Sequence, residues 1–319
     1  MTAPARARLR RLAVLALLAV GAWYVARSLG AQWSQVRLAA ATLRPRWSLI
    51  AAASVVVLAT HALLVQSWRA LLAAWGGRLP YWTGARIWTV SNLARYVPGT
   101  LWAVGAMGVL ADEAGVPPAV AGGAAILNTL INLAAGFVVV TAFGGDAAAR
   151  LAPGLPHARV LAAVVGVGGA LALPIALPAL TALAARLLRR VPPARLPVRT
   201  FAAVFLSNVC AWLAYGVAFW LFTRAILPAA GDNWVGYVAV FTGSYLIGFL
   251  ALLAPGGLFV REGAMVLALT GLGLVPNAVD ASLVAVASRL WLTVLEVVPG
   301  VAFFAGGALR RRRGVPATA

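Results

Sequence analysis

Long apolar runs constrain the fold of this chain more than any other feature of its sequence. Six of them reach spanning length, at about residues 12–29, 48–75, 117–142, 160–186, 201–227 and 280–308. A membrane-spanning helix needs about 20 predominantly apolar residues. Hydrophobic residues make up 63% of the chain and charged residues only 10%, which leaves no stretch with the mixed polarity of a soluble domain. We predict an all-α polytopic membrane protein with about six transmembrane helices in a single domain, residues 1–319.

Two further apolar stretches, at about residues 82–114 and 234–272, are each broken by proline and glycine. The first break reads Arg95-Tyr96-Val97-Pro98-Gly99-Thr100-Leu101-Trp102, and the second reads Pro255-Gly256-Gly257-Leu258-Phe259-Val260-Arg261-Glu262. A broken helix is tolerated at membrane depth only against protein or a water-filled cavity. Each stretch is therefore expected to form a broken helical hairpin, either re-entrant or built from two full spans.

The two breaks divide the chain into halves of similar design. The first half covers about residues 48–142 and the second about residues 201–308, and each consists of a span, a break and a span. The chain crosses the membrane an odd number of times between the two first spans, so the halves have opposite orientation. The sequence thus predicts an inverted repeat, in which broken segments at corresponding positions mark a binding site near the midplane.

Positive charge is concentrated at the ends of the apolar runs. The formal net charge is +19, and every one of the 26 basic residues is arginine. Clusters lie in the tails 1–11 and 309–319 and between residues 186 and 199. This is the positive-inside pattern, so we predict that both termini are cytoplasmic, although residues 30–47 carry three arginines on the opposite side. Clusters with this placement argue against nucleic acid as a partner.

Several ionisable residues are predicted to lie at membrane depth, where charge is costly and usually functional. In a binding role, Arg95 and Arg261 would hold a phosphate, since a guanidinium fork matches a pair of phosphate oxygens. Glu262 would orient Arg261 or exchange a proton, and Arg289 and Glu296 would form a supporting charge network. In a structural role, the same residues would pair with one another and lock helices together. The remaining candidate headgroup contacts flank the breaks: Tyr96, Pro98, Gly99, Pro255, Gly256 and Gly257.

Other polar residues in the spans fit packing roles better than chemistry. His61 has no carboxylate near it in sequence, and Asn128, Asn132 and Asn208 are typical of hydrogen bonds between neighbouring helices. Nucleotide-binding loops and metal-ligand patterns are absent from the sequence, so no cofactor, metal or catalytic residue is predicted. The chain is better explained as a transporter than as an enzyme.

At its two breaks the sequence resembles the transmembrane-region family of lysylphosphatidylglycerol synthase, also called the flippase-like domain family. The second motif, Pro255-Gly256-Gly257 followed by Arg261-Glu262, carries most of the resemblance, and Tyr96, Pro98, Gly99 and Trp102 match a form of the first. The resemblance implies a multi-pass protein of the bacterial inner (cytoplasmic) membrane that binds or translocates lipid. We expect this chain to be a stand-alone member without the soluble aminoacyl-transfer domain.

These observations lead to two functional hypotheses. The first is movement of an anionic or phosphate-bearing lipid, either a phospholipid or a polyprenyl-phosphate-linked lipid, between membrane leaflets. The alternative is an accessory or catalytic membrane subunit of a lipid-modifying or glycosyltransferase system, which would require a soluble or membrane enzyme as its partner.

Overall fold

The chain is a helical membrane-embedded protein. The computed structural model describes residues 44–96, 102–151, 157, 160, 164, 168, 196–250 and 260–312, and these contain eight α-helices, one 3-10 helix and no strand. Four helices are long and apolar enough to cross a membrane: α2 (Trp47–Ala74), α5 (Pro118–Leu151), α7 (Val198–Ile226) and α10 (Ala278–Arg312). They coincide with four of the six predicted spans. The other two, 12–29 and 160–186, lie wholly or almost wholly outside the described residues.

The outward faces of these four helices are apolar, as expected for contact with lipid. Large hydrophobic side chains are exposed on each of them, including Val55 on α2, Ile126 on α5, Leu206 on α7 and Val279 on α10. An apolar surface of this extent on several faces of one protein indicates contact with a membrane rather than with water.

Shorter helices occupy the two broken stretches. The first contains α3 (Tyr81–Asn92), the 3-10 helix η1 (Leu93–Tyr96) and α4 (Trp102–Asp112). The second contains α8 (Trp234–Leu250) and α9 (Val260–Gly271). These α-helices have 11 to 17 residues. At 1.5 Å per residue that corresponds to roughly 17–26 Å, less than the ~30 Å of a hydrocarbon core.

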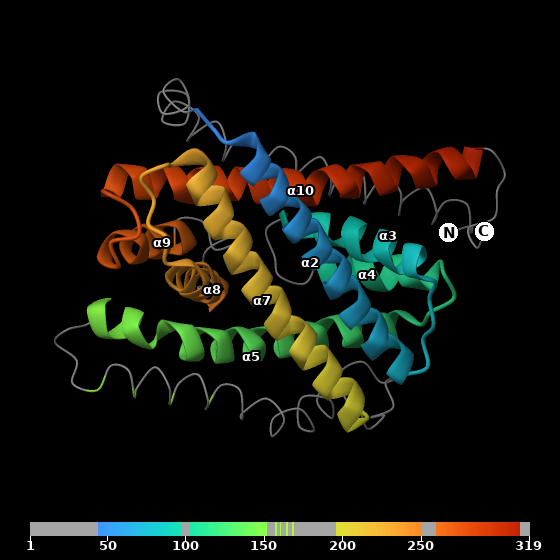
Figure 1. Cartoon of the computed structure of the whole chain (residues 1–319). Coiled ribbons are helices and arrows are strands. Elements are labelled where there is room, and N and C mark those ends of the chain that lie inside the picture. Colours follow the sequence, from blue (N-terminus) through green and yellow to red (C-terminus); the bar gives the residue numbers. More distant parts are fainter. Residues whose placement is uncertain are drawn as a thin grey trace.

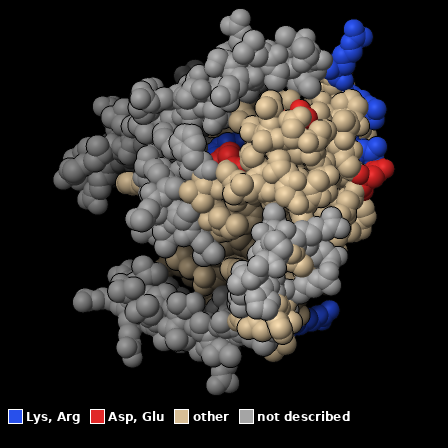
Figure 2. Space-filling view, turned by 90° about the vertical axis from the view of Figure 1, so that its left-hand side faces the viewer, with Lys and Arg blue, Asp and Glu red and all other residues tan. Residues whose placement is uncertain are grey.

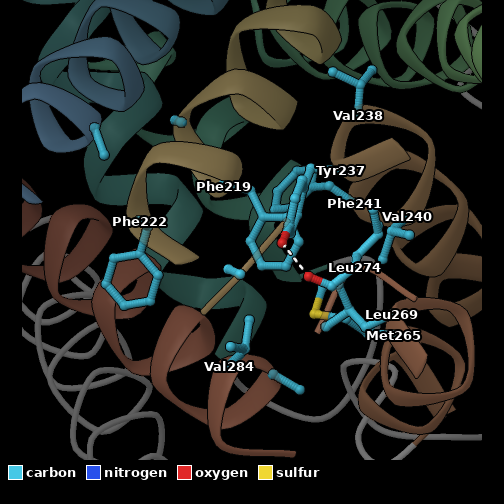
Figure 3. Packing of buried hydrophobic residues seen from close by; sticks show 14 of the residues in the cluster. Phe219, Phe222, Tyr237, Val238, Val240, Phe241, Met265, Leu269, Leu274 and Val284 are labelled. Carbon is cyan, nitrogen blue, oxygen red and sulfur yellow. Dashed lines mark hydrogen bonds between the residues drawn. The ribbon is translucent and has the colours of Figure 1, made fainter. Parts of the chain in front are cut away.

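The first and last residues of each hairpin lie next to each other. In the second hairpin, the backbone N–H of Gly231 donates to the carbonyl of Leu274 over 2.9 Å, and the Tyr237 hydroxyl donates to the same carbonyl over 2.8 Å (Figure 3). In the first hairpin, Gly77 packs so closely that a Cβ there would lie 3.1 Å from Cγ1 of Val116. The two ends of each pair of short helices therefore lie side by side.

Helices α2 and α7 form the centre of the structure and run in opposite directions (Figure 1). The backbone N–H of Arg46, just before α2, donates over 2.9 Å to the carbonyl of Ala225 at the end of α7. Helices α5 and α10 also run in opposite directions, on opposite sides of this central pair (Figure 1). Corresponding helices of the two halves are thus oriented oppositely.

Each hairpin packs on long helices of both halves. The first hairpin contacts α10 through α3 and η1, and the second contacts α5 through α8. A close approach supports the first contact, because a Cβ on Gly300 of α10 would lie 2.8 Å from a methyl group of Leu93. These contacts between the hairpins and the long helices of the other half hold the two halves together.

Helices α4 and α9 end in the same way. Gly115 and Gly273 have positive φ angles of 80° and 64°, a conformation that glycine adopts without a steric penalty. In each case the next residue closes the helix: Val116 N–H donates to the carbonyl of Ala111, and Leu274 N–H to that of Leu269, both over 3.0 Å. This is the Schellman cap, and it reverses the chain toward the following long helix at corresponding points of the two halves.

Two hydrophobic cores support the hairpins. One surrounds the first hairpin and includes Trp68, Leu71, Ile87 and Ile131. The other surrounds the second hairpin and is richer in aromatic residues, including Phe219, Phe222, Tyr237 and Phe241 (Figure 3). The second core is therefore packed by large side chains from α7 and α8 at the base of α9.

One helix extends beyond its predicted end. The predicted span stops at residue 142, whereas α5 continues to Leu151. The apolar pattern fades after residue 142, whereas a run of alanines with high helix propensity follows it and continues the helix.

The contact between α7 and α8 leads to a stability prediction. A Cβ on Gly216 would lie 2.6 Å from the Cα of Val238, which is backbone and cannot rotate away. We expect Gly216→Ala to destabilise the fold by about 1–3 kcal/mol through overpacking, seen as a lower thermal unfolding midpoint in detergent. The control is Gly105→Ala on α4, where nothing lies within 4 Å. Equal midpoints for the two variants would contradict the close packing of α7 on α8.

Candidate functional site

The first turn of α9 places Arg261 against two aromatic rings of α8. Its guanidinium carbon lies 5.4 Å from the ring centroid of Phe241 and 5.2 Å from that of Tyr245. The two rings are one helical turn apart and thus lie on the same face of α8. Cation–π contacts of this kind stabilise a guanidinium in surroundings that offer it little water.

Close approach of the two helices holds Arg261 in this position. A Cβ on Gly248 would lie 2.8 Å from the Cβ of Arg261 and 3.4 Å from its Cα. Only glycine at this position of α8 allows the first turn of α9 to come so near. The close contact between α8 and α9 therefore fixes the position of Arg261.

The guanidinium of Arg261 is not fully satisfied. Its Nε is buried and has no hydrogen-bond partner among the described residues. A buried donor without a partner is costly, and the cost is greater when the group is charged. Such a group is suited to bind an acceptor, and an anionic oxygen would be the strongest one.

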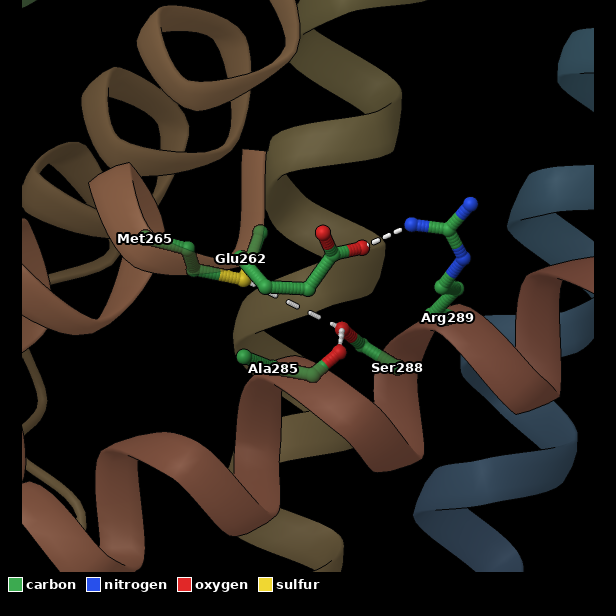
Figure 4. A network of polar contacts seen from close by, with 5 residues as sticks. All are labelled: Glu262, Met265, Ala285, Ser288 and Arg289. Carbon is green, nitrogen blue, oxygen red and sulfur yellow. Dashed lines mark hydrogen bonds and ion pairs between the residues drawn. The ribbon is translucent and has the colours of Figure 1, made fainter. Parts of the chain in front are cut away.

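A second arginine lies beside the first turn of α9. Arg289 of α10 donates through Nη1 to Oε1 of Glu262, forming an ion pair between the two helices (Figure 4). The pair is mostly buried, with 23% of the Arg289 side chain and 14% of the Glu262 side chain exposed. The other carboxylate oxygen of Glu262 is buried and lacks a partner.

The helices that carry this ion pair are also joined by a weaker contact. The hydroxyl of Ser288 lies 3.9 Å from the sulfur of Met265 and donates over 3.0 Å to the carbonyl of Ala285 (Figure 4). Ser288 and Met265 are both buried. This contact fixes α10 against α9 immediately next to the charges.

Four charged residues predicted from the sequence are brought together here. Arg261 lies within electrostatic range of Glu262, Arg289 and Glu296, and also of Tyr245. Glu262 pairs with Arg289, as expected if these residues lock helices together, whereas in the binding role it was expected to orient Arg261 or exchange a proton. We call Arg261, Glu262, Arg289 and Glu296 the charge cluster.

Charged atoms are also visible within the surface of the molecule. On the face that corresponds to the left-hand side of Figure 1, basic and acidic atoms lie together in a recess, apart from the charged atoms at the edge (Figure 2). The surrounding surface of the described residues is largely uncharged (Figure 2).

The first break contributes less to the described site. Arg95 and Tyr96 lie in η1, but their side chains are outside the described part of the structure. The remaining predicted headgroup contacts also lie outside it: Pro98, Gly99, Pro255, Gly256 and Gly257.

Aromatic residues connect the first hairpin to the charge cluster. His61 of α2 lies between Trp88 of α3 and Tyr215 of α7, at ring-centroid distances of 5.8 and 6.1 Å. Tyr215 in turn stacks on Phe241 at 5.8 Å, and Phe241 lies under Arg261. His61 is thus packed among aromatic rings, in agreement with the packing role predicted for it.

Two of the three asparagines form the interhelical hydrogen bond expected of them. Asn132 of α5 donates to Oδ1 of Asn208 on α7 over 2.8 Å, and the indole of Trp212 donates to the carbonyl of Asn132 over 2.8 Å. A counterpart joins α10 to α2, where the indole of Trp291 donates to Ser54 over 2.9 Å. The Oδ1 of Asn128 is buried without a partner.

Sequence reasoning missed the α8 side of the site. Phe241, Tyr245 and Gly248 contact Arg261 directly, yet all three are ordinary residues for an apolar helix. A signal was present, because their spacing of four and three residues puts two aromatic rings and a glycine on one face. Only the position of α9 reveals what that face contacts.

The described residues offer no group of three or more His, Cys, Asp or Glu side chains that could hold a metal ion. Comparison of the sequence with protein-family models and with curated proteins found no match.

The ion pair between α9 and α10 leads to a second stability prediction. Arg289→Gln leaves the carboxylate of Glu262 without its counter-ion, so we expect a loss of about 1–3 kcal/mol in unfolding free energy. Adding Glu262→Gln removes that uncompensated charge and restores most of the loss. Thermal unfolding of the two single variants and the double variant in detergent measures this coupling.

A second arginine–carboxylate pair provides the control. Arg224 pairs with Asp232, whose side chain is 76% exposed, so Arg224→Gln is expected to cost less than about 1 kcal/mol. Equal losses for Arg224→Gln and Arg289→Gln would mean that the Arg289–Glu262 pair contributes no more than a surface contact.

Proposed function

We propose that this protein moves an anionic or phosphate-bearing lipid between the leaflets of a bacterial inner (cytoplasmic) membrane. The observation that carries the proposal is the guanidinium of Arg261, which packs on Phe241 and Tyr245 and has a buried Nε without a partner. A charge at the centre of a membrane helix costs about 2.5–3.5 kcal/mol on insertion scales, so its retention points to a function.

Phosphate is the ligand that best matches this group. An arginine side chain stays charged at all physiological pH values and offers donors in a planar fork. A phosphate oxygen accepts charge-assisted hydrogen bonds that are about twice as strong as neutral ones. The phosphate of a lipid headgroup also needs a polar route through hydrocarbon, which a charged site within the protein supplies.

We further propose that the two hairpins are re-entrant and that the halves form an inverted repeat. Three observations support this arrangement: the shared start and end of each hairpin, the opposite directions of α2 and α7, and the matching caps at Gly115 and Gly273. In such proteins, rocking of one repeat against the other gives alternating access to a site at the midplane.

Cytoplasmic positions for both termini belong to the same proposal. The arginine clusters in the tails and between residues 186 and 199 support it through the positive-inside rule. The resemblance of Pro255-Gly256-Gly257 and Arg261-Glu262 to the flippase-like domain family supports lipid as the substrate class. The proposal requires neither a cofactor nor a partner enzyme.

The proposal is tested with pure protein in liposomes. We expect the wild-type protein to carry fluorescently labelled phosphatidylglycerol from the inner to the outer leaflet, where dithionite quenches it. Arg261→Gln removes the charged donors, and we expect a rate at least about tenfold lower. Arg78→Gln, which changes an exposed arginine outside the site, serves as the matched control and retains the wild-type rate.

Equal rates for wild-type protein and a folded Arg261→Gln variant would contradict the assignment of Arg261. Absence of movement in the wild-type protein, with both labelled phosphatidylglycerol and labelled polyprenyl phosphate, would favour the alternative of a subunit in a lipid-modifying or glycosyltransferase system.

A further inference from the structure

The ion pair between Glu262 and Arg289 satisfies only one of the two carboxylate oxygens within the described residues. Arg289 donates to one carboxylate oxygen, while the other side of its guanidinium points away from Glu262 (Figure 4). The second oxygen of Glu262 is buried and has no partner. A pair built only to lock two helices together gains most when both groups are fully satisfied. The carboxylate of Glu262 is not satisfied in that way within the described residues.

The second guanidinium lies beside the one already assigned to the ligand. Arg261 and Arg289 are within electrostatic range of each other, on facing helices α9 and α10. Two like charges that interact in apolar surroundings repel and are stabilised by anions between or beside them. Glu262 supplies one such anion to Arg289, and Glu296 lies within electrostatic range of Arg261.

We propose that the carboxylate of Glu262 occupies the place of a ligand anion on Arg289, and that a lipid ending in a phosphomonoester displaces it to bind Arg261 and Arg289 together. This inference rests on the proposed function and adds the substrate class to it. It also gives Arg289 a direct binding role, where the sequence had assigned it a supporting one.

Charge decides which lipids can make the exchange. A phosphodiester, as in phosphatidylglycerol, carries one negative charge, and replacing one monoanion on Arg289 by another gains little. A phosphomonoester carries about −1.5 to −2 at pH 7 and has three terminal oxygens. A phosphomonoester therefore binds more tightly when it contacts both guanidiniums, whereas a phosphodiester gains binding free energy mainly from Arg261. Phosphatidic acid and polyprenyl phosphates both end in this group.

The test is calorimetric binding of two short-chain lipids to the full chain in a zwitterionic detergent. The probes are dihexanoyl phosphatidic acid, a phosphomonoester, and dihexanoyl phosphatidylglycerol, a phosphodiester. We expect the wild-type protein to bind the phosphomonoester at least about tenfold more tightly. Arg289→Gln is expected to remove this preference by weakening the phosphomonoester alone. Glu262→Gln frees Arg289 without displacement, so it is expected to tighten phosphodiester binding several-fold.

A double variant protects the test against a failure to fold. Glu262→Gln combined with Arg289→Gln removes both charges and leaves neither uncompensated, and it is expected to bind the two lipids equally, as Arg289→Gln does. A preference that survives in this variant, or an equal loss for both lipids, would overturn the inference.

Arg261→Gln distinguishes a failure of this inference from a failure of the proposed function. If both lipids depend on Arg261 but neither responds to Glu262→Gln or Arg289→Gln, the inference is wrong and the proposed function stands. If neither lipid binds the wild-type protein, the proposed function is wrong as well.

Discussion

The antiparallel packing of α2 on α7 is the contact on which the rest of the structure depends. It joins the two halves through their corresponding helices, from the hydrogen bond at Arg46 and Ala225 along the length of both. The first hairpin then contacts α10 of the second half, and the second hairpin contacts α5 of the first half. Separating the halves would therefore expose apolar surface. With little hydrophobic driving force between helices in lipid, close packing at small residues such as Gly216 and Gly300 supplies the cohesion.

The second constraint is the cost of placing charged side chains among apolar helices, and it bears on the charge cluster at α9 and α10. Arg261 is held by two aromatic rings and by the absence of a side chain at Gly248. Arg289 does have a carboxylate, from Glu262. In our proposals, Arg261 binds the ligand directly, and the ligand replaces Glu262 on Arg289. This asymmetry underlies both the proposed function and the selectivity inferred for it.

Much of the fold could be predicted from the sequence, because spans of apolar residues and their proline-glycine breaks are local features. Helices α2, α5, α7 and α10 begin within three residues of the predicted spans. The charge cluster was predicted residue by residue, since charges in apolar sequence are conspicuous. The pairing of Glu262 with Arg289 agrees with the structural alternative, in which these residues pair with one another, but the aromatic contacts of Arg261 with Tyr245 and Phe241 were not predicted. Such contacts depend on how helices cross, which no local pattern records.

The central claim is that Arg261 binds the phosphate of a lipid inside the protein, and photo-crosslinking tests it most directly. The photoreactive residue p-benzoylphenylalanine replaces Tyr245 beside Arg261, or Leu206 on the exposed face of α7 as a control, and adducts formed in native membranes are identified by mass spectrometry. The account predicts that lipids crosslinked at position 245 are enriched in anionic phosphate headgroups over those at position 206, and that Arg261→Gln abolishes the enrichment. The same lipid composition at both positions would contradict it.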